Sequence, residues 1–245
     1  ETRQGKEKPS RLEEVRLYMH EHYGARYWQD READDGMAYE QSLAISQGKH
    51  DLSVIVSRDK DLSIVQGLHL DFNSYKLVDV QGLGSIFMCK TASQTKLAGW
   101  GPMFFWAQML MGDTADNISG IPLIHPPRLN AVAPTKDTEK WAAMASQGDE
   151  KAMARLLARK PKQCGPAMAY SLLNGVTSNM QAWQLVASCY KEHADRVGFK
   201  DYRTGEAISW VDAAASEAQL LWMRTDADAS PDNWKIWHTA NKDMQ

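Results

Sequence analysis

Three features that this 245-residue sequence lacks limit the classes of protein to which it can belong. No apolar run approaches the ~20 residues that a membrane-spanning helix needs, so we expect no membrane insertion. The three cysteines, Cys89, Cys164 and Cys189, are odd in number and far apart, which argues against a disulfide framework or a zinc cluster and is typical of a reducing cytoplasm. The seven histidines show no metal-ligand spacing.

The charge balance is mildly acidic, with a formal net charge of −3. Such a value does not indicate a nucleic-acid partner, but it does not exclude one, because an acidic catalytic cluster can offset basic segments elsewhere. Hydrophobic residues make up 43% of the chain and charged residues 24%, both ordinary for a globular protein. The length suffices for one domain or for a domain with an appendage.

Periodicity and chain-breaking residues divide the chain into an α/β half and a helical half. In the first half we predict helices from Ser10, in a capping box with Glu13, to Gly24, over 32–47 and over 102–111, and strands over 52–56, 76–80 and 85–89. The helix over 102–111 is apolar almost all round, which indicates burial. After Gly112 prolines are frequent, and all predicted elements are helices, over 137–146, 149–159, 166–174, 179–196 and 207–224.

Three acidic clusters stand out by their position. Glu32-Ala33-Asp34-Asp35 begins a helix, Asp59-Lys60-Asp61 follows the strand over 52–56, and Asp113-Thr114-Ala115-Asp116 follows the buried helix. Sites in open α/β sheets form outside the carboxyl ends of strands, where Asp59 and Asp61 should lie. Converging carboxylates repel one another unless cations lie between them, and oxygen ligands without histidine or cysteine select Mg²⁺, with Mn²⁺ as a substitute.

Each cluster taken alone also has a purely structural explanation. Acidic residues in the first turn of a helix complement the helix dipole, which accounts for the cluster at 32–35. Aspartates form turns through hydrogen bonds to nearby backbone, which accounts for the clusters at 59–61 and 113–116. Only the combination of the three clusters, in this order, favours a metal site.

In order and approximate spacing, three motifs resemble those of the 5′-nuclease family, which comprises flap endonucleases, phage 5′–3′ exonucleases and the 5′-nuclease domains of bacterial DNA polymerase I. The motifs are Glu32-Ala33-Asp34-Asp35, Val56-Ser57-Arg58-Asp59-Lys60-Asp61-Leu62 and Gly112-Asp113-Thr114-Ala115-Asp116-Asn117-Ile118-Ser119-Gly120-Ile121-Pro122. The resemblance covers about residues 1–125 and 163–225. It implies a PIN-like α/β fold with a parallel-sheet core, followed by a helix–three-turn–helix region that grips duplex DNA.

The resemblance assigns metal ligands to seven carboxylates: Glu32, Asp34, Asp35, Asp59, Asp61, Asp113 and Asp116. It implies that they hold Mg²⁺ ions against the scissile phosphate, with Asp35, Asp59 and Asp113 as the catalytic residues. Metal ions in such a site lower the pKa of a bound water and stabilise the leaving oxygen. Lys60 is interpreted as structural or charge-balancing, because the family's essential lysine lies in a part of the family sequence without a counterpart here.

Contacts to DNA are implied for Gly120 and for the turn Gln163-Cys164-Gly165-Pro166, which matches the family's glycine-rich turn at Gly165. About forty residues separate this turn from Pro122, whereas the family continues at once. The inserted segment is basic, and we interpret Lys160 and Lys162 as contacts to DNA phosphates, although a solvated helical face explains the same pattern. The family often binds K⁺ through backbone carbonyls in this motif, so a K⁺ site is also implied.

The N-terminal residues Thr2-Arg3-Gln4-Gly5-Lys6 resemble the end of the family's arch motif. This implies that Arg3 and Lys6 contact the 5′ strand, and a solvated terminus is the alternative. Because the match begins at the arch, the family's first strand, which carries a further aspartate, has no counterpart. Loss of a central strand exposes hydrogen-bonding edges, so we expect this chain, expressed alone, to be unstable and at best feebly active.

Three regions follow from these matches: an α/β nuclease core lacking its N-terminal strand over 1–112, a helix–three-turn–helix DNA-binding region over 113–200 with a basic insertion at about 123–162, and a C-terminal helix and tail packing back on the core over 201–245. The implied function is a metal-dependent 5′–3′ exonuclease or flap endonuclease in DNA replication or repair. We expect a monomer in the cytoplasm of a bacterium or a phage-infected host.

Two alternatives stay open at this point. A catalytically inactive, structure-specific DNA-binding relative is permitted by the missing aspartate, although a binding module gains nothing from seven carboxylates beside phosphate. A PIN-like ribonuclease shares the α/β metal-site layout, although the 112–122 motif and the helical half favour duplex DNA.

Overall fold

A computed structural model describes residues 9–72, 74–90, 95–123, 140, 143–144, 146–157 and 162–225. The longer helices are α1 (Leu12–Tyr23), α2 (Ala33–Ser46), α3 (Pro102–Met111), α5 (Glu150–Leu157), α6 (Pro166–Leu173), α7 (Asn179–Arg196) and α8 (Trp210–Leu221), with short 3-10 helices η1 (His50–Leu52) and η2 (Asp61–Ile64). The strands of the first half are β1 (Val54–Ser57), β2 (Gly67–Asp71), β3 (Leu77–Val80), β4 (Ser85–Lys90) and β5 (Thr95–Trp100). The chain is a mixed α/β protein, as predicted.

The sheet beside the candidate site has the order β1-β2-β3 and is mixed. β1 runs parallel to β2, with Ser57 opposite Asp71, and β3 is antiparallel to β2. Within the described residues the expected parallel core is therefore limited to one parallel pair. The central strand β2 was not predicted, because its short run is interrupted by polar residues. The strand predicted over 52–56 begins two residues later, since Leu52 closes η1.

A β-hairpin of β4 and β5 forms a separate two-stranded sheet, and β5 was also missed by the sequence pattern. Its two faces differ. Leu97 is buried and, with Ile86 and Met88, belongs to the core that includes α3 and α6. Because side chains alternate along a strand, Phe87 and Trp100 lie on the opposite face. The hairpin thus covers the core with one face and leaves the other available beside β2.

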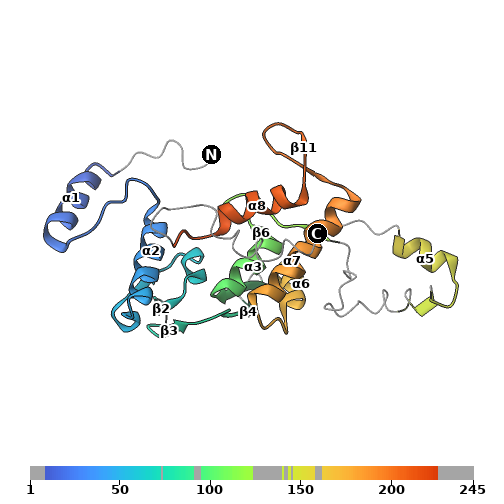
Figure 1. Ribbon diagram of the computed structural model, residues 1–245, viewed down its shortest axis with the longest axis horizontal. Coiled ribbons are helices and arrows are strands. Elements are labelled where there is room, and N and C mark those ends of the chain that lie inside the picture. The colour runs from blue at the N-terminus through green and yellow to red at the C-terminus, as the bar shows by residue number, and fades with distance from the viewer. Residues whose placement is uncertain are drawn as a thin grey trace.

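The centre of the core is α3, in which every residue from Pro102 to Leu110 is buried, as its all-round apolar sequence predicted. Helices α6, α7 and α8 pack against it, as seen in the middle of Figure 1. Two hydrogen bonds fix the contact with α7: Trp106 Nε1 donates to Asn179 Oδ1 at 3.0 Å, and Tyr190 Oη donates to the Met109 carbonyl at 3.2 Å. Burial of the whole helix gives its last residues, next to the third acidic cluster, a fixed position.

The second half is not purely helical, which corrects the prediction. It contains three short antiparallel pairs: β6 (Gly112–Asp113) with β7 (Ile118–Ser119), β8 (Pro122–Leu123) with β9 (Lys162–Gln163), and β10 (Phe199–Lys200) with β11 (Ala207–Ile208). Two-residue strands carry too little periodicity to be recognised. Because β11 occupies 207–208, α8 begins only at Trp210, capped by the Ser209 hydroxyl, which accepts from the Asp212 backbone N–H at 3.1 Å. The helix predicted over 137–146 lies mostly outside the described residues.

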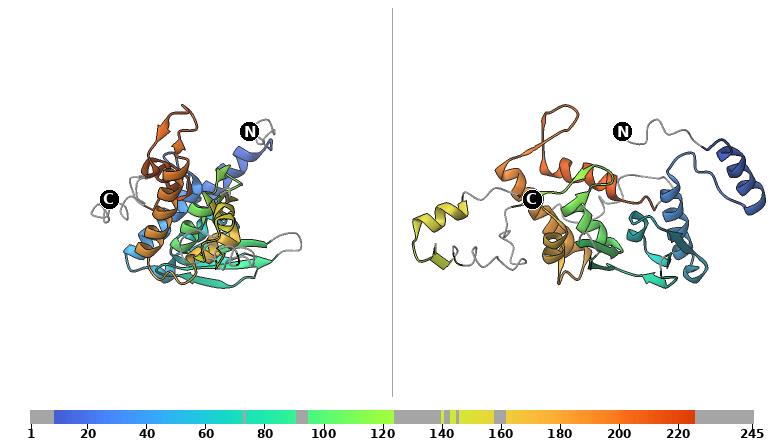
Figure 2. Two further views of the ribbon diagram at one scale, coloured as in Figure 1. Left: turned by 90° about the vertical axis from the view of Figure 1, so that its right-hand side faces the viewer. Right: turned by 180° about the vertical axis from the view of Figure 1, so that it is seen from behind.

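The pair β8–β9 joins the two ends of the insertion. The Cys164 backbone N–H donates to the Ile121 carbonyl at 2.9 Å, so the third motif continues in space directly into α6. α5, within the insertion, lies at one end of the long axis of the molecule, and α1 lies at the other (Figures 1 and 2).

The N-terminal helix α1 has no buried residue. Its N-cap is Arg11, without a side-chain cap, so the predicted capping box of Ser10 and Glu13 does not form. The predicted stop is confirmed, because Gly24 has the left-handed conformation with φ of 66°.

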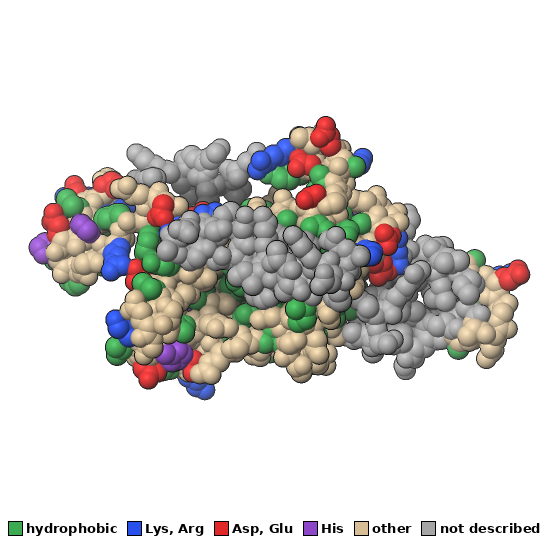
Figure 3. All heavy atoms as spheres, viewed as in Figure 1, with side chains coloured by type: hydrophobic (Ala, Val, Ile, Leu, Met, Phe, Trp, Pro, Cys, Tyr) green, Lys and Arg blue, Asp and Glu red, His purple; other side chains and the backbone are tan. Residues whose placement is uncertain are grey.

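Acidic and basic side chains intermingle over the described part of the face in Figure 3, in small groups of either sign. Among the described residues, no helix combines the length and apolar character needed to cross a bilayer.

The contact between α7 and α8 generates a prediction about stability. Burial raises the pKa of Glu217 on α8 to about 7, and Tyr190 Oη lies 2.5 Å from its Oε2. Since the ordinary pKa is 4.5, folding favours the protonated acid: stability is greatest below pH 4.5 and is lost as pH rises toward 7. Glu217→Gln should therefore stabilise the protein by about 3 kcal/mol at pH 8 and by little at pH 4, measured by urea denaturation.

The matched control is Glu206→Gln, an exposed residue in the loop before β11. It should change the free energy of unfolding little at either pH. A Glu217→Gln effect equal at pH 4 and pH 8 would contradict the burial of a titrating carboxyl group here.

Candidate metal centre

Three carboxylates from two distant segments meet at the end of α3. Asp61, Asp113 and Asp116 each offer an oxygen, and these oxygens all lie within 4.8 Å of one another. Asp113 is buried, Asp61 is half-buried and Asp116 is exposed, so the group opens to solvent on one side. Burial raises the pKa of Asp116, and the neighbouring charges of Asp113 and Asp61 raise it further, against an opposing effect of Lys60. The three negative charges therefore repel one another.

Lys60 neutralises part of this charge. Its Nζ donates to Asp61 Oδ1 at 2.9 Å and also to Asp113 Oδ2. Burial by itself lowers the pKa of Lys60, but the hydrogen bonds to the two carboxylates outweigh it and the pKa is raised. The ammonium group thus occupies the position, between two carboxylates, where a metal ion would also be attracted. This agrees with the charge-balancing role predicted for Lys60.

The buried Gln108 amide is a neighbour of the site that the sequence did not indicate. Its Nε2 donates to Asp61 Oδ1 at 2.9 Å and to Asp113 Oδ2 at 3.2 Å. Its Oε1 is buried without a hydrogen-bond partner among the described residues. Burying this carbonyl oxygen without a partner costs about 1–3 kcal/mol. The two hydrogen bonds from Nε2 to the carboxylates hold the amide in this orientation despite that cost. The signal in the sequence was a single polar residue on a helix that is otherwise apolar.

Two glycines shape the turn that carries Asp113 and Asp116. Gly112 has φ of +72°, and a Cβ there would lie 2.3 Å from the Ile118 carbonyl oxygen. A Cβ on Gly120 would lie 2.5 Å from the Met111 carbonyl oxygen. Both positions therefore exclude other residues. The Asp113 carboxylate also accepts the Ala115 backbone N–H at 2.9 Å, which fixes its orientation.

The pKa of Asp113 is lowered. Burial on its own would raise it, but hydrogen bonds from Lys60, the Ala115 backbone and Gln108 outweigh this effect. Asp113 is therefore held as an ionised carboxylate in a largely buried position, which is the state that a metal ligand requires.

The second cluster follows β1 in a tight turn. The Ser57 hydroxyl accepts from the Asp59 backbone N–H at 3.0 Å, and Asp59 Oδ1 in turn accepts from the Asp61 backbone N–H at 3.0 Å. Asp61 starts η2, where Leu62 and Ile64 are buried in the core. Since the turn is anchored on both sides, the two carboxylates are placed at the carboxyl end of β1, as predicted.

The first cluster approaches the second from α2. Burial raises the pKa of Asp34, and the negative charges of Asp59, Glu32, Asp35 and Asp61 raise it further. Repulsion from Asp59 and Asp61 shows that the start of α2 faces the end of β1. Glu32, the N-cap of α2, is exposed and makes no side-chain cap.

Asp35 is engaged by the chain after α8. Its Oδ1 accepts the Arg224 backbone N–H at 2.9 Å, and its Oδ2 lies 3.8 Å from Arg224 Nε. This arginine was not singled out from the sequence, since no local pattern links two residues so far apart. Its backbone N–H and guanidinium hold the orientation of this carboxylate.

The predicted DNA contacts are placed only in part. Gly120 is buried against α3, and Gly165 is the N-cap of α6 with open space where a Cβ would lie, so the structure gives no steric reason for glycine there. Lys162 belongs to β9, but its side chain lies outside the described part, as do Arg3, Lys6 and Lys160.

Asp61, Asp113 and Asp116 are thus brought together from two segments, and Asp34, from the third, lies close enough to Asp59 and Asp61 for their charges to raise its pKa beyond the effect of burial. Glu32 and Asp35 flank Asp34 at the start of α2. A scan against protein-family models, a search of curated proteins and a search of solved structures each gave no match to this chain. The chemistry of the site must therefore be argued from its geometry. An all-oxygen donor set with an excess of negative charge suits a hard divalent cation such as Mg²⁺ or Mn²⁺.

Metal affinity tests this geometry. Asp113→Asn removes the most buried charge of the group and should weaken Mn²⁺ binding about tenfold or more, because affinity for hard cations follows the number of charged ligands. Mn²⁺ binding can be followed by the paramagnetic resonance signal of the free ion. Asp51→Asn, an exposed carboxylate in η1, is the matched control and should bind as the unaltered protein does. Equal affinities of all three proteins would remove the candidate site.

Proposed function

We propose that this protein is a divalent-metal-dependent 5′-nuclease that hydrolyses phosphodiester bonds of DNA near 5′ ends, as an exonuclease or flap endonuclease. The observation that carries the proposal is the convergence of carboxylates from three sequence motifs, whose order resembles that of 5′-nucleases, around one solvent-accessible group of Asp61, Asp113 and Asp116.

The residues present fit a cation. The donor set is made of oxygens, and burial raises the pKa of Asp34 and Asp116, with the neighbouring carboxylates raising each further. The single ammonium of Lys60 cannot balance the whole group. When bound, Mg²⁺ would supply Lewis-acid chemistry toward a phosphate oxygen and a bound water. Asp61, Asp113 and Asp116 would hold it, and Asp34, Asp35 and Asp59 extend the ligand set toward α2.

The chain's own side chains do three things in this proposal. Gln108 and the Ala115 backbone N–H hold Asp113 in a fixed orientation. Arg224 does the same for Asp35. Lys60, at the rim, balances charge and can move from Asp113 to a substrate phosphate, since its side chain is half exposed. Ordered carboxylates need little reorganisation when a substrate arrives, which favours the transition state.

Two features favour duplex DNA over RNA as the substrate: the order of the three motifs, and the backbone hydrogen bond that brings Cys164 next to Ile121. The bond between the Cys164 N–H and the Ile121 carbonyl places the start of α6 directly after the third motif in space, where the family resemblance implies a helix–three-turn–helix. An inactive DNA-binding relative is disfavoured, because negative charge next to phosphate weakens binding unless a cation is present.

Cleavage of a 5′-labelled DNA duplex with a single-stranded 5′ tail tests the proposal. We expect Mg²⁺-dependent release of nucleotides or short fragments from the 5′ end, and loss of activity by at least about 100-fold in Asp59→Asn and in Asp113→Asn. Asp51→Asn should cleave at the original rate. Cleavage that survives in both site variants, or that persists with excess chelator, would contradict the proposal.

A further inference from the structure

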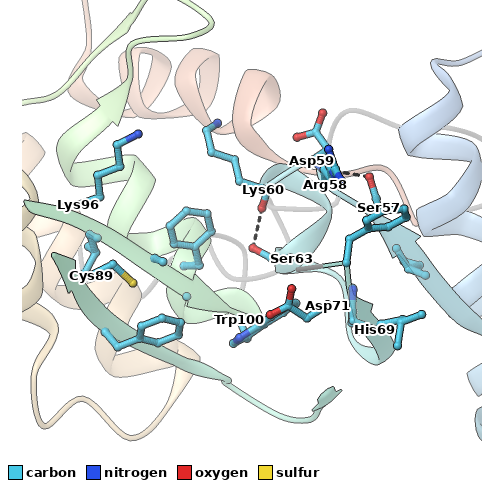
Figure 4. A pocket seen from close by; sticks show the side chains of 18 residues that line it. Ser57, Arg58, Asp59, Lys60, Ser63, His69, Asp71, Cys89, Lys96 and Trp100 are labelled. Atoms are coloured by element: carbon cyan, nitrogen blue, oxygen red, sulfur yellow. Dashed lines mark hydrogen bonds between the residues drawn. The ribbon is translucent and has the colours of Figure 1, made fainter. Parts of the chain in front are cut away.

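A cavity of about 360 Å³ opens directly beside the candidate metal centre. It lies between the carboxyl end of β1 and β2 and the face of the β4–β5 hairpin that is turned away from the core (Figure 4). Asp59 and Lys60 line this cavity, and Lys60 also donates hydrogen bonds to Asp61 and Asp113 of the candidate metal centre. Its volume falls within the ~300–1,000 Å³ typical of small-molecule sites. Cavity and metal centre are therefore two parts of one continuous surface.

The walls of the cavity are aromatic. Phe72, Phe87, Trp100 and Phe104 line it, and they come from β2, β4, β5 and α3 or their ends. Phe87 is 42% exposed and Phe72 is 39% exposed. Large aromatic side chains that stay exposed inside a hollow, rather than packing into the core, offer flat surfaces for stacking.

The charged residues that line the cavity are of both signs: Arg58, Lys60 and Lys96 are basic, and Asp59 and Asp71 are acidic. Arg58 lies over the ring of Phe72, with its guanidinium carbon 4.7 Å from the ring centroid, and Lys96 extends from β5 toward the same side as Lys60 (Figure 4). Lys60 is engaged with Asp61 and Asp113, but Lys96 stands across the opening on an exposed position. The cavity thus combines aromatic surfaces inside with two cationic side chains, Arg58 and Lys96, that can meet phosphates on the side away from the carboxylates that bind Lys60.

We propose that this cavity receives one unpaired nucleobase of the DNA strand that is cut, stacked against Phe87, while Lys96 and Arg58 contact the adjoining phosphates. A flat, uncharged ring attached to an anionic backbone matches aromatic walls and these two cationic side chains. A base pair within a duplex cannot enter a hollow of this size, so the site selects an unstacked nucleotide. The assignment rests on the proposed function for its substrate class, and it adds where the strand is held relative to the metal centre.

Binding of a tailed duplex tests the inference without cleavage. The probe is a fluorescent duplex with a single-stranded 5′ tail made either of thymidines or of abasic residues, measured by anisotropy with Ca²⁺ in place of Mg²⁺. The unaltered protein should bind the thymidine tail at least about fivefold more tightly, because stacking of a base on an aromatic side chain contributes about 1–3 kcal/mol. Phe87→Ala should remove this difference, and Phe87→Trp should retain it.

The charge at the rim is tested by a matched pair on the hairpin. Lys96→Gln should weaken binding of both tails about equally and reduce the dependence on salt, because it removes a phosphate contact. Lys90 is the control. Lys96 is paired with Cys89 across the hairpin, and because side chains alternate along a strand, Lys90 lies on the opposite face from both. Lys90→Gln should therefore bind both tails as the unaltered protein does.

The outcomes separate this inference from the proposed function. Equal affinity of the unaltered protein for the two tails overturns the nucleobase site, even if Mg²⁺-dependent cleavage is observed and Asp59→Asn abolishes it. A preference for the thymidine tail that disappears in Phe87→Ala supports the site, even if no cleavage is found. A preference that survives in Phe87→Ala, in a variant whose melting temperature is unchanged, places the base elsewhere and also overturns the inference.

Discussion

Mutual repulsion of carboxylates is the constraint on which the candidate site depends. Asp61, Asp113 and Asp116 are held within 4.8 Å of one another, although each pair of like charges at such a distance opposes folding. The fold compensates with the Lys60 ammonium and with donors from Gln108 and the Ala115 backbone. This compensation leaves the pKa of Asp116 raised, by burial and then by the charges of Asp113 and Asp61. A bound cation would complete it, so the geometry suits function better than stability.

The rest of the architecture fixes this arrangement. The fully buried helix α3 ends at Gly112 and delivers Asp113 to the site, while the buried Leu62 and Ile64 anchor the turn with Asp59 and Asp61. These anchors lie in one hydrophobic core, so the two segments cannot move apart without exposing it. The third segment, at the start of α2, is tied to the chain after α8 through Asp35 and Arg224. Stability of the helical half is thereby linked to the position of the carboxylates.

Local patterns in the sequence predicted what depends on local patterns. The buried helix over 102–111, the helix ends at Gly24 and the turn after β1 follow from apolar periodicity, glycine and aspartate chemistry. Strands β2 and β5 escaped prediction because glycine and charged residues interrupt them, and their pairing depends on partners remote in sequence. The short pairs β6–β7, β8–β9 and β10–β11 are likewise tertiary features. The capping box expected at Ser10 does not form, and α1 has no buried residue whose packing would explain why.

The same distinction applies to the site. Its acidic residues were recognisable because three clusters with one chemistry recur in a definite order. Gln108 and Arg224 were not, because a single polar residue on an apolar helix and a single arginine after another helix carry no pattern. The aromatic cavity was also hidden, since its walls come from four elements that the sequence does not connect. Contacts between residues that are remote in sequence are created by the fold, and local sequence patterns do not reveal them.

Mapping a redox-active metal onto the chain tests the convergence of the acidic segments most directly. With Fe²⁺ bound in place of Mg²⁺, ascorbate and peroxide generate hydroxyl radicals that cut the backbone near the metal. The account predicts cuts in three separate stretches of one protein, close to Asp34, Asp61 and Asp113, all suppressed by excess Mg²⁺. Cuts confined to a single stretch, or cuts that Mg²⁺ does not suppress, would contradict it.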